Sequence, residues 1–130
     1  GVEHAVSFPG WLSEGQVREQ LARSRVFILL STKPGERLPN AVKEGMAAGC
    51  VCISSDSPGI EELLEDGHSG FILEVGSEAR IVQTVLFALG DEAMPISRAA
   101  ALRVRSGFDV EVSARRYLAF WQGKDEKAHE

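Results

Sequence analysis

Short apolar runs alternate with helical patterns along this chain, and that alternation limits the possible folds more than any other feature. The run at residues 26–30 is apolar from end to end, which is typical of a strand buried on both faces of a parallel sheet. Before the next apolar run, at 51–54, Pro39 can begin a helix and Gly49 can end it. Strands that alternate with helices in this way predict an α/β fold, a Rossmann-like parallel sheet with crossover helices.

The other elements follow from the same kinds of signal. Ser13 and Gln16 form a capping box, with the serine at the cap and the glutamine three residues later, which predicts a helix to about residue 22. Turn residues such as Pro58 and Gly59 separate the later elements. We predict strands at 6–8, 26–30, 51–54 and 71–73, and helices at 14–22, 39–48, 60–65, 78–89, 95–106 and 110–121.

The 130 residues suit one domain, which we predict to span residues 1–121, followed by a charged, frayed tail at 122–130. A net charge of −5, with no cluster of Lys and Arg, argues against nucleic acid as a partner. No apolar run approaches the ~20 residues that a membrane-spanning helix needs. Cys50 and Cys52 are predicted to be small buried residues with free thiols, rather than a disulfide or a metal site.

The stretch that carries chemistry runs from residue 31 to residue 49. It contains a loop at the carboxyl end of a predicted strand and then the start of a helix, which is where open α/β sheets bind ligands. The N–H groups of Asn40, Ala41 and Val42 are expected to be free at this helix start. Because the helix dipole adds partial positive charge there, a phosphate is the expected guest.

Two glutamates flank this helix start. Glu36 comes just before it, and Glu44 lies one turn after Asn40 on the same helix face. Each carboxylate can accept two hydroxyl hydrogen bonds, which suits a sugar or a ribose diol. On composition alone the simpler interpretation is stronger, since a Glu before a helix favours its dipole and a Glu within one is usually solvated. Small residues are expected to let the helix pack closely on the sheet: Gly45, Ala47, Ala48 and Gly49.

Five segments in order resemble the retaining glycosyltransferases of family 4. Glu36 and Glu44, with seven residues between them, resemble that family's Glu-x7-Glu signature. Four further segments resemble parts of the family's sequence. Residues 6–10 resemble its strand ending in Gly, residues 50–56 its next strand, residues 58–63 its Gly-Gly-x-x-Glu-Leu motif and residues 67–71 its Asp-Gly-x-x-Gly motif. The resemblance covers about residues 6–121, and Arg37 departs from it because many members have Gly there.

This resemblance implies a GT-B enzyme, in which two Rossmann-like domains enclose the active site. The chain would be the C-terminal, nucleotide-sugar-binding domain without its first two strands. Glu36 would be the catalytic residue, in contact with the transferred sugar, and Glu44 would bind the ribose hydroxyls. The other donor contacts would come from the base pocket at Gly10, Trp11 and Leu12, and from backbone groups at Arg37, Leu38, Pro39 and Asn40.

The same resemblance implies transfer of a sugar with retention of configuration, without a metal or a cofactor. The partners would be the nucleotide-sugar donor and the missing N-terminal acceptor domain, and any peripheral membrane contact would go through that half. We expect a cytoplasmic enzyme of polysaccharide or lipid-linked glycan synthesis. The isolated chain should be inactive, because the family's cations that neutralise the leaving diphosphate would lie before residue 1.

A domain without its first two strands should keep three parallel strands, ordered 26–30, 51–54 and 71–73. The run at 6–8 should then be unpaired, or should move to the free edge of the 26–30 strand. As a free polypeptide, such a domain should be marginally stable or should associate through that apolar edge.

Two other classes of protein are alternatives. Another GT-B enzyme, such as a non-hydrolysing epimerase, would need catalytic His and Asp residues at other places, and this chain has only three histidines. A non-catalytic flavodoxin-like binding module would need an acidic cluster at its first strand end, or a flavin loop, and the sequence contains neither. A glycosyltransferase is therefore the preferred hypothesis, while the base, the sugar and the acceptor are not defined by the sequence.

Overall fold

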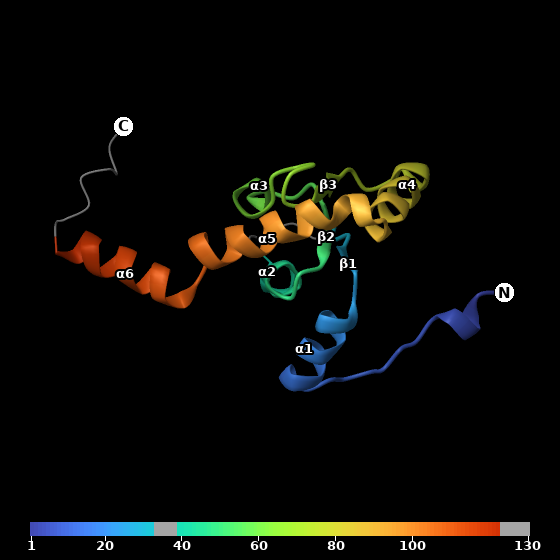
Figure 1. Ribbon diagram of the computed structural model, residues 1–130, viewed down its shortest axis with the longest axis horizontal. Coiled ribbons are helices and arrows are strands. Elements are labelled where there is room, and N and C mark those ends of the chain that lie inside the picture. Colours follow the sequence, from blue (N-terminus) through green and yellow to red (C-terminus); the bar gives the residue numbers. More distant parts are fainter. Residues whose placement is uncertain (33–38, 123–130) are drawn as a thin grey trace.

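The computed structural model describes residues 1–32 and 39–122 of the chain. At its centre lie three parallel strands, β1 (Val26–Leu29), β2 (Val51–Ser55) and β3 (Phe71–Leu73), in the order β1-β2-β3 (Figure 1). The register pairs Val26 with Val51 and Ile53 with Phe71. The predicted α/β fold and the predicted order of the three parallel strands are confirmed.

Helices connect and cover the strands. The capping box at the first α-helix is confirmed: the Gln16 N–H donates to Ser13 Oγ, and the Ser13 N–H donates to Gln16 Oε1. A single turn after β2 ends at Leu63, two residues earlier than predicted. The helices are η1 (Glu3–Ala5), α1 (Glu14–Arg23), α2 (Asn40–Ala47), α3 (Ile60–Leu63), α4 (Glu78–Leu89), η2 (Asp91–Ala93), α5 (Met94–Gly107) and α6 (Val110–Trp121).

The predicted strand at 6–8 is not formed. The chain from Val6 to the start of α1 contains no strand, and it extends apart from the sheet, joining the rest of the molecule at α1 (Figure 1). Phe8 is 91% exposed, so this segment buries little apolar surface. Among the described strands, β2 is the one neighbour of β1, so the segment is unpaired, which is one of the two arrangements expected for it.

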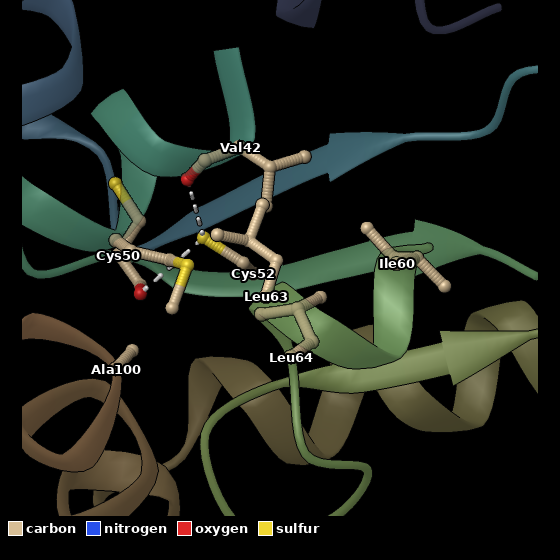
Figure 2. Close-up of a cluster of buried hydrophobic side chains, with 8 residues drawn as sticks. Val42, Cys50, Cys52, Ile60, Leu63, Leu64 and Ala100 are labelled. Atoms are coloured by element: carbon tan, nitrogen blue, oxygen red, sulfur yellow. Dashed lines mark hydrogen bonds between the residues drawn. The ribbon is translucent and has the colours of Figure 1, made fainter. Parts of the chain in front are cut away.

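Two apolar clusters hold the helices to the two faces of the sheet. The first joins β2 to α2, α3 and α5, and Figure 2 shows its buried side chains around Cys52. The second joins the other face of β2 to α4 and η2. Helix α5 contributes to both clusters, through Ala100 to the first and Ile96 to the second. The sheet is therefore the middle of three layers, with α5 linking the outer two.

Both thiols are free and buried, as predicted. Cys50 and Cys52 belong to the same cluster, because side chains two residues apart along an extended backbone share a face. Burial raises the pKa of the Cys50 thiol, while burial and the neighbouring Cys50 raise the pKa of Cys52 to about 12. Their role is to fill space beneath α2.

Helix α2 packs closely on the sheet at one glycine. A Cβ added to Gly45 would lie 2.9 Å from Phe27 Cγ and 3.1 Å from Cys52 Sγ, which is too close for any side chain to fit without movement. The prediction of close packing is confirmed at Gly45. It is wrong for Ala47, Ala48 and Gly49, which are exposed because the helix has turned them away from the sheet.

Candidate functional site

The connection from β1 to α2 begins and ends at well-defined places on the carboxyl side of the sheet. Ser31 is held by Ser55, the last residue of β2, through two hydrogen bonds. Pro39 is buried and occupies the cap position of α2, which begins at Asn40. The start of α2 thus lies where a parallel sheet binds ligands, while residues 33–38 of the predicted loop are outside the described residues.

The start of α2 offers fewer backbone donors than predicted. The Val42 N–H donates to the Pro39 carbonyl at 3.1 Å, so the prediction that it is free is wrong. The first turn is tighter than an ideal α-helix, which lets this N–H reach the carbonyl three residues back. The N–H groups of Asn40 and Ala41 have no partner among the described residues, and both residues are exposed. These two groups and the helix dipole remain suited to a phosphate.

Glu44 faces a cavity of about 590 Å³ between α1 and α2. Leu12 lines the same cavity. The structure therefore brings together Glu44, predicted to bind the ribose, and Leu12, predicted to contact the base. Val17, Leu21 and the exposed face of α2 at its C-terminal end make most of the lining apolar. The complete lining is Leu12, Glu14, Val17, Arg18, Leu21, Ala22, Glu44, Ala47 and Ala48.

A charged pair at the rim of this cavity was not predicted. Arg18 Nη2 lies 3.4 Å from Glu14 Oε2, one helix turn apart on α1. Both side chains are largely exposed, so the pair contributes little to stability. The sequence does contain a signal for this pair, because Glu14 and Arg18 are four residues apart in a predicted helix that follows Leu12.

The other predicted base-pocket residues do not line the cavity. Gly10 has a φ of 73°, a left-handed conformation that turns the chain just before α1. Trp11 is 98% exposed and lies outside the lining, although its neighbour Leu12 is part of it. Glu36, Arg37 and Leu38 lie outside the described residues, so the predicted pairing of Glu36 with Glu44 stays a prediction.

The described residues contain neither a metal-binding cluster nor a membrane-spanning helix. No group of three or more His, Cys, Asp and Glu side chains in that part of the chain could hold a metal ion. None of the helices described is long and apolar enough to cross a membrane. The candidate site comprises the cavity between α1 and the C-terminal half of α2 and the start of α2 at Asn40.

The chain combines a parallel α/β sheet, a helix start suited to a phosphate and an apolar cavity between α1 and α2, an arrangement typical of ligand-binding α/β domains. Residues 1–103 match the glycosyl transferases group 1 family, and the chain belongs to this family. Solved structures of Anabaena HepE share its fold. The complex of that protein with UDP and glucose has a TM-score of 0.81 at 20% identity, covering 94% of this chain and 33% of HepE.

Two curated relatives are glycosyltransferases named for amylovoran and for colanic acid biosynthesis. The chain is 28% identical over 121 residues to the amylovoran biosynthesis glycosyltransferase AmsK of Erwinia amylovora, covering 88% of this chain and 30% of AmsK. It is 30% identical over 129 residues to the putative colanic acid biosynthesis glycosyltransferase WcaL of Escherichia coli, covering 93% of this chain and 32% of WcaL. The chain thus spans about a third of the length of these relatives.

Proposed function

We propose that this chain supplies the nucleotide-sugar-binding surface of a retaining glycosyltransferase of family 4. The observation that supports this most directly is that Leu12 and Glu44 line one cavity between α1 and the C-terminal half of α2. An apolar wall suits a nucleotide base, and a carboxylate at its edge suits a ribose diol. HepE, whose fold is similar, was solved with UDP-glucose, and we extend that class of donor to this chain.

The remaining contacts follow from the order of groups along the site. With the ribose on Glu44, the diphosphate reaches the N–H groups of Asn40 and Ala41 at the positive end of α2. Backbone groups of Arg37, Leu38 and Pro39 bind the diphosphate and the sugar hydroxyls. Glu36 is the catalytic residue in this proposal, because a carboxylate against the sugar stabilises the positive charge that develops in the transition state.

The complete enzyme needs a second domain in this proposal. The relatives are about three times as long as this chain, which leaves room for an acceptor-binding domain. Exposed apolar residues of α6, Tyr117, Leu118 and Trp121, offer a surface on which that domain can pack. We propose a cytoplasmic enzyme of polysaccharide or lipid-linked glycan synthesis that works without a metal or a cofactor, and free buried thiols suit such a reducing compartment.

The test is titration of the chain with UDP, GDP and ADP, followed by the variant Glu44→Gln. This change removes the charge and half of the acceptor capacity while keeping the shape of the side chain. We expect the dissociation constant of the preferred nucleotide to rise about 10- to 100-fold, as for the loss of one or two hydrogen bonds to a charged group. Glu92→Gln is the matched control, because Glu92 is exposed in η2, near the amino end of β1.

Two results would contradict the proposal. If the wild-type chain binds no nucleoside diphosphate, the proposal that it contains the donor site is wrong. If wild type and Glu44→Gln bind the nucleotide with equal affinity, Glu44 does not contact the ribose as proposed. In the complete enzyme, Glu36→Ala should lower kcat more than it raises KM for the donor, and a wild-type kcat removes the catalytic role given to Glu36.

A further inference from the structure

The cavity between α1 and the C-terminal half of α2 is lined by charged side chains whose balance is negative. Glu14 and Glu44 carry carboxylates and Arg18 carries a guanidinium, while the rest of the lining is apolar. Two carboxylates against one cation disfavour a phosphate group in this space. The part of a nucleotide sugar that suits the cavity is therefore an uncharged one that offers hydrogen-bond donors, which describes the base and its ribose.

The size and the apolar walls of the cavity suit a flat ring. Its volume of about 590 Å³ lies within the range of about 300–1,000 Å³ that is typical of small-molecule sites. Ala47 and Ala48, which α2 turns away from the sheet, are small enough to leave room for a ring, and Val17 and Leu21 line the cavity from α1. A ribose bound to Glu44 on α2 leaves its base free to reach the polar groups of α1.

Those polar groups are a carboxylate and a guanidinium held next to each other. Arg18 Nη2 lies 3.4 Å from Glu14 Oε2, and neither side chain has another partner among the described residues. Glu14 is the first residue of α1, directly after the cap residue Ser13, so the capping box fixes its backbone. The pair therefore presents an acceptor and several donors from a defined position, with most of their hydrogen-bonding capacity unused.

The nucleobases differ in what they offer to a carboxylate, which can only accept hydrogen bonds. Guanine has two adjacent donors, the N1–H and the 2-amino group, so both carboxylate oxygens can be paired. Its O6 lies beside them and accepts from a guanidinium. In uracil, adenine and cytosine the N–H group at the edge lies beside a carbonyl oxygen or a ring nitrogen. The second carboxylate oxygen would then meet a lone pair instead of a donor.

We propose that the donor of this chain carries guanine, and that Glu14 and Arg18 determine this specificity. The inference rests on the proposed function and names the base of its nucleotide sugar. Glu14 accepts from the N1–H and the 2-amino group, and Arg18 donates to O6. Because a guanidinium has more N–H donors than one contact uses, Arg18 can bind Glu14 and the base together.

The experiment titrates the full chain with GDP, UDP, ADP and inosine diphosphate, which is GDP without the 2-amino group. We expect GDP to bind about tenfold or more tightly than the other three, because a site built around a donor rejects analogues that lack it. Glu14→Gln should weaken GDP binding about 10- to 100-fold and bring GDP and inosine diphosphate to similar affinities. Arg18→Met should weaken these two nucleotides by similar factors, since both carry O6.

Glu19→Gln and Arg23→Met are the matched controls, because both residues are exposed on α1 and lie outside the cavity lining. They make the same changes of charge and should leave all four affinities unchanged. The inference is overturned, and the proposed function kept, if UDP or ADP binds as tightly as GDP. It is also overturned if Glu14→Gln keeps the wild-type ratio of GDP to inosine diphosphate affinity, or weakens GDP no more than Glu19→Gln does. If wild type binds none of the four nucleotides, the proposed function itself is wrong.

Discussion

The thiol of Cys52 is enclosed by the first apolar cluster, and this position couples its ionisation to folding. Burial, with a smaller contribution from Cys50, raises its pKa from 9.0 to about 12. In the unfolded chain the thiol ionises near its ordinary pKa, whereas in the folded chain it keeps its proton. Between pH 9 and pH 12 the folded state therefore binds more protons, so its stability falls as the pH rises.

This coupling gives a measurable pH dependence. We expect the free energy of unfolding to be independent of this group below about pH 9 and to decrease from there towards pH 12. Cys52→Ala should be less stable at pH 7, because a buried sulfur is lost, but its stability should decline less steeply above pH 9. Urea unfolding of both proteins at pH 7, 9 and 10.5 measures the two slopes, and parallel slopes would contradict the expectation.

Site residues were predictable from the sequence where local rules decide their placement. The helix starts one residue later than predicted, at Asn40 with Pro39 as its cap, and Glu44 reaches the cavity because it lies one turn inside α2. The placement of the remaining site residues depends on tertiary packing and on turn geometry, which the sequence pattern does not show. Trp11 points to solvent although Leu12 lines the cavity, and the N–H of Val42 is used within its own turn.

At the scale of elements, α3 depends on a residue far away in the sequence. The guanidinium of Arg103, on α5, donates to the carbonyl oxygen of Leu63 at 2.8 Å and to that of Glu62 at 3.0 Å. These carbonyls lie at the C-terminal end of α3, where a helix carries partial negative charge and lacks intrahelical donors. Glu65 Oε2 is 4.0 Å from the same guanidinium, so Arg103 joins α5 to both α3 and the turn after it.

Replacing Arg103 with Met keeps the aliphatic stem and removes these donors. We expect Arg103→Met to lower the free energy of unfolding by about 1–2 kcal/mol, the cost of unpaired carbonyls that remain partly accessible to water. Arg105→Met is the control, because Arg105 is exposed on the same helix and should change stability by less than about 0.5 kcal/mol. Chemical denaturation measures both, and equal effects would show that the contact with α3 contributes nothing.

Strands were predictable where burial and pairing agree. The continuous apolar runs around Ile28 and Ile53 form β1 and β2, which pair in parallel. All of β2 is buried, whereas β1 is only partly buried, with Ile28 exposed, so the predicted burial on both faces holds for β2 alone. The run at 6–8 has a strand-like composition as well, but no described strand lies beside it, and a strand without a partner has no backbone hydrogen bonds to form. Composition therefore predicted the type of segment, while pairing depends on the rest of the sheet.

In the molecule as a whole, both β1 and β3 are edge strands of the described sheet, and β1 is the longer of the two. On one side β1 pairs with β2, and on the other no described strand accompanies it. Ile28, near the middle of β1, is 42% exposed, whereas every residue of β2 is buried. An apolar edge of this kind presents unpaired backbone groups and an apolar side chain to solvent, which favours pairing with another chain.

We therefore expect the isolated chain to associate as its concentration rises, and Ile28→Lys to weaken that association about tenfold or more, since a charge on an edge strand opposes pairing. Leu102→Lys is the matched control: Leu102 is an exposed apolar residue on the helix α5 and is not part of the sheet. Sedimentation velocity over a range of concentrations distinguishes the three proteins. If Leu102→Lys disperses the chain as effectively as Ile28→Lys, general apolar exposure drives the association. If wild type stays monomeric at every concentration, the edge of β1 is protected, and the prediction is wrong.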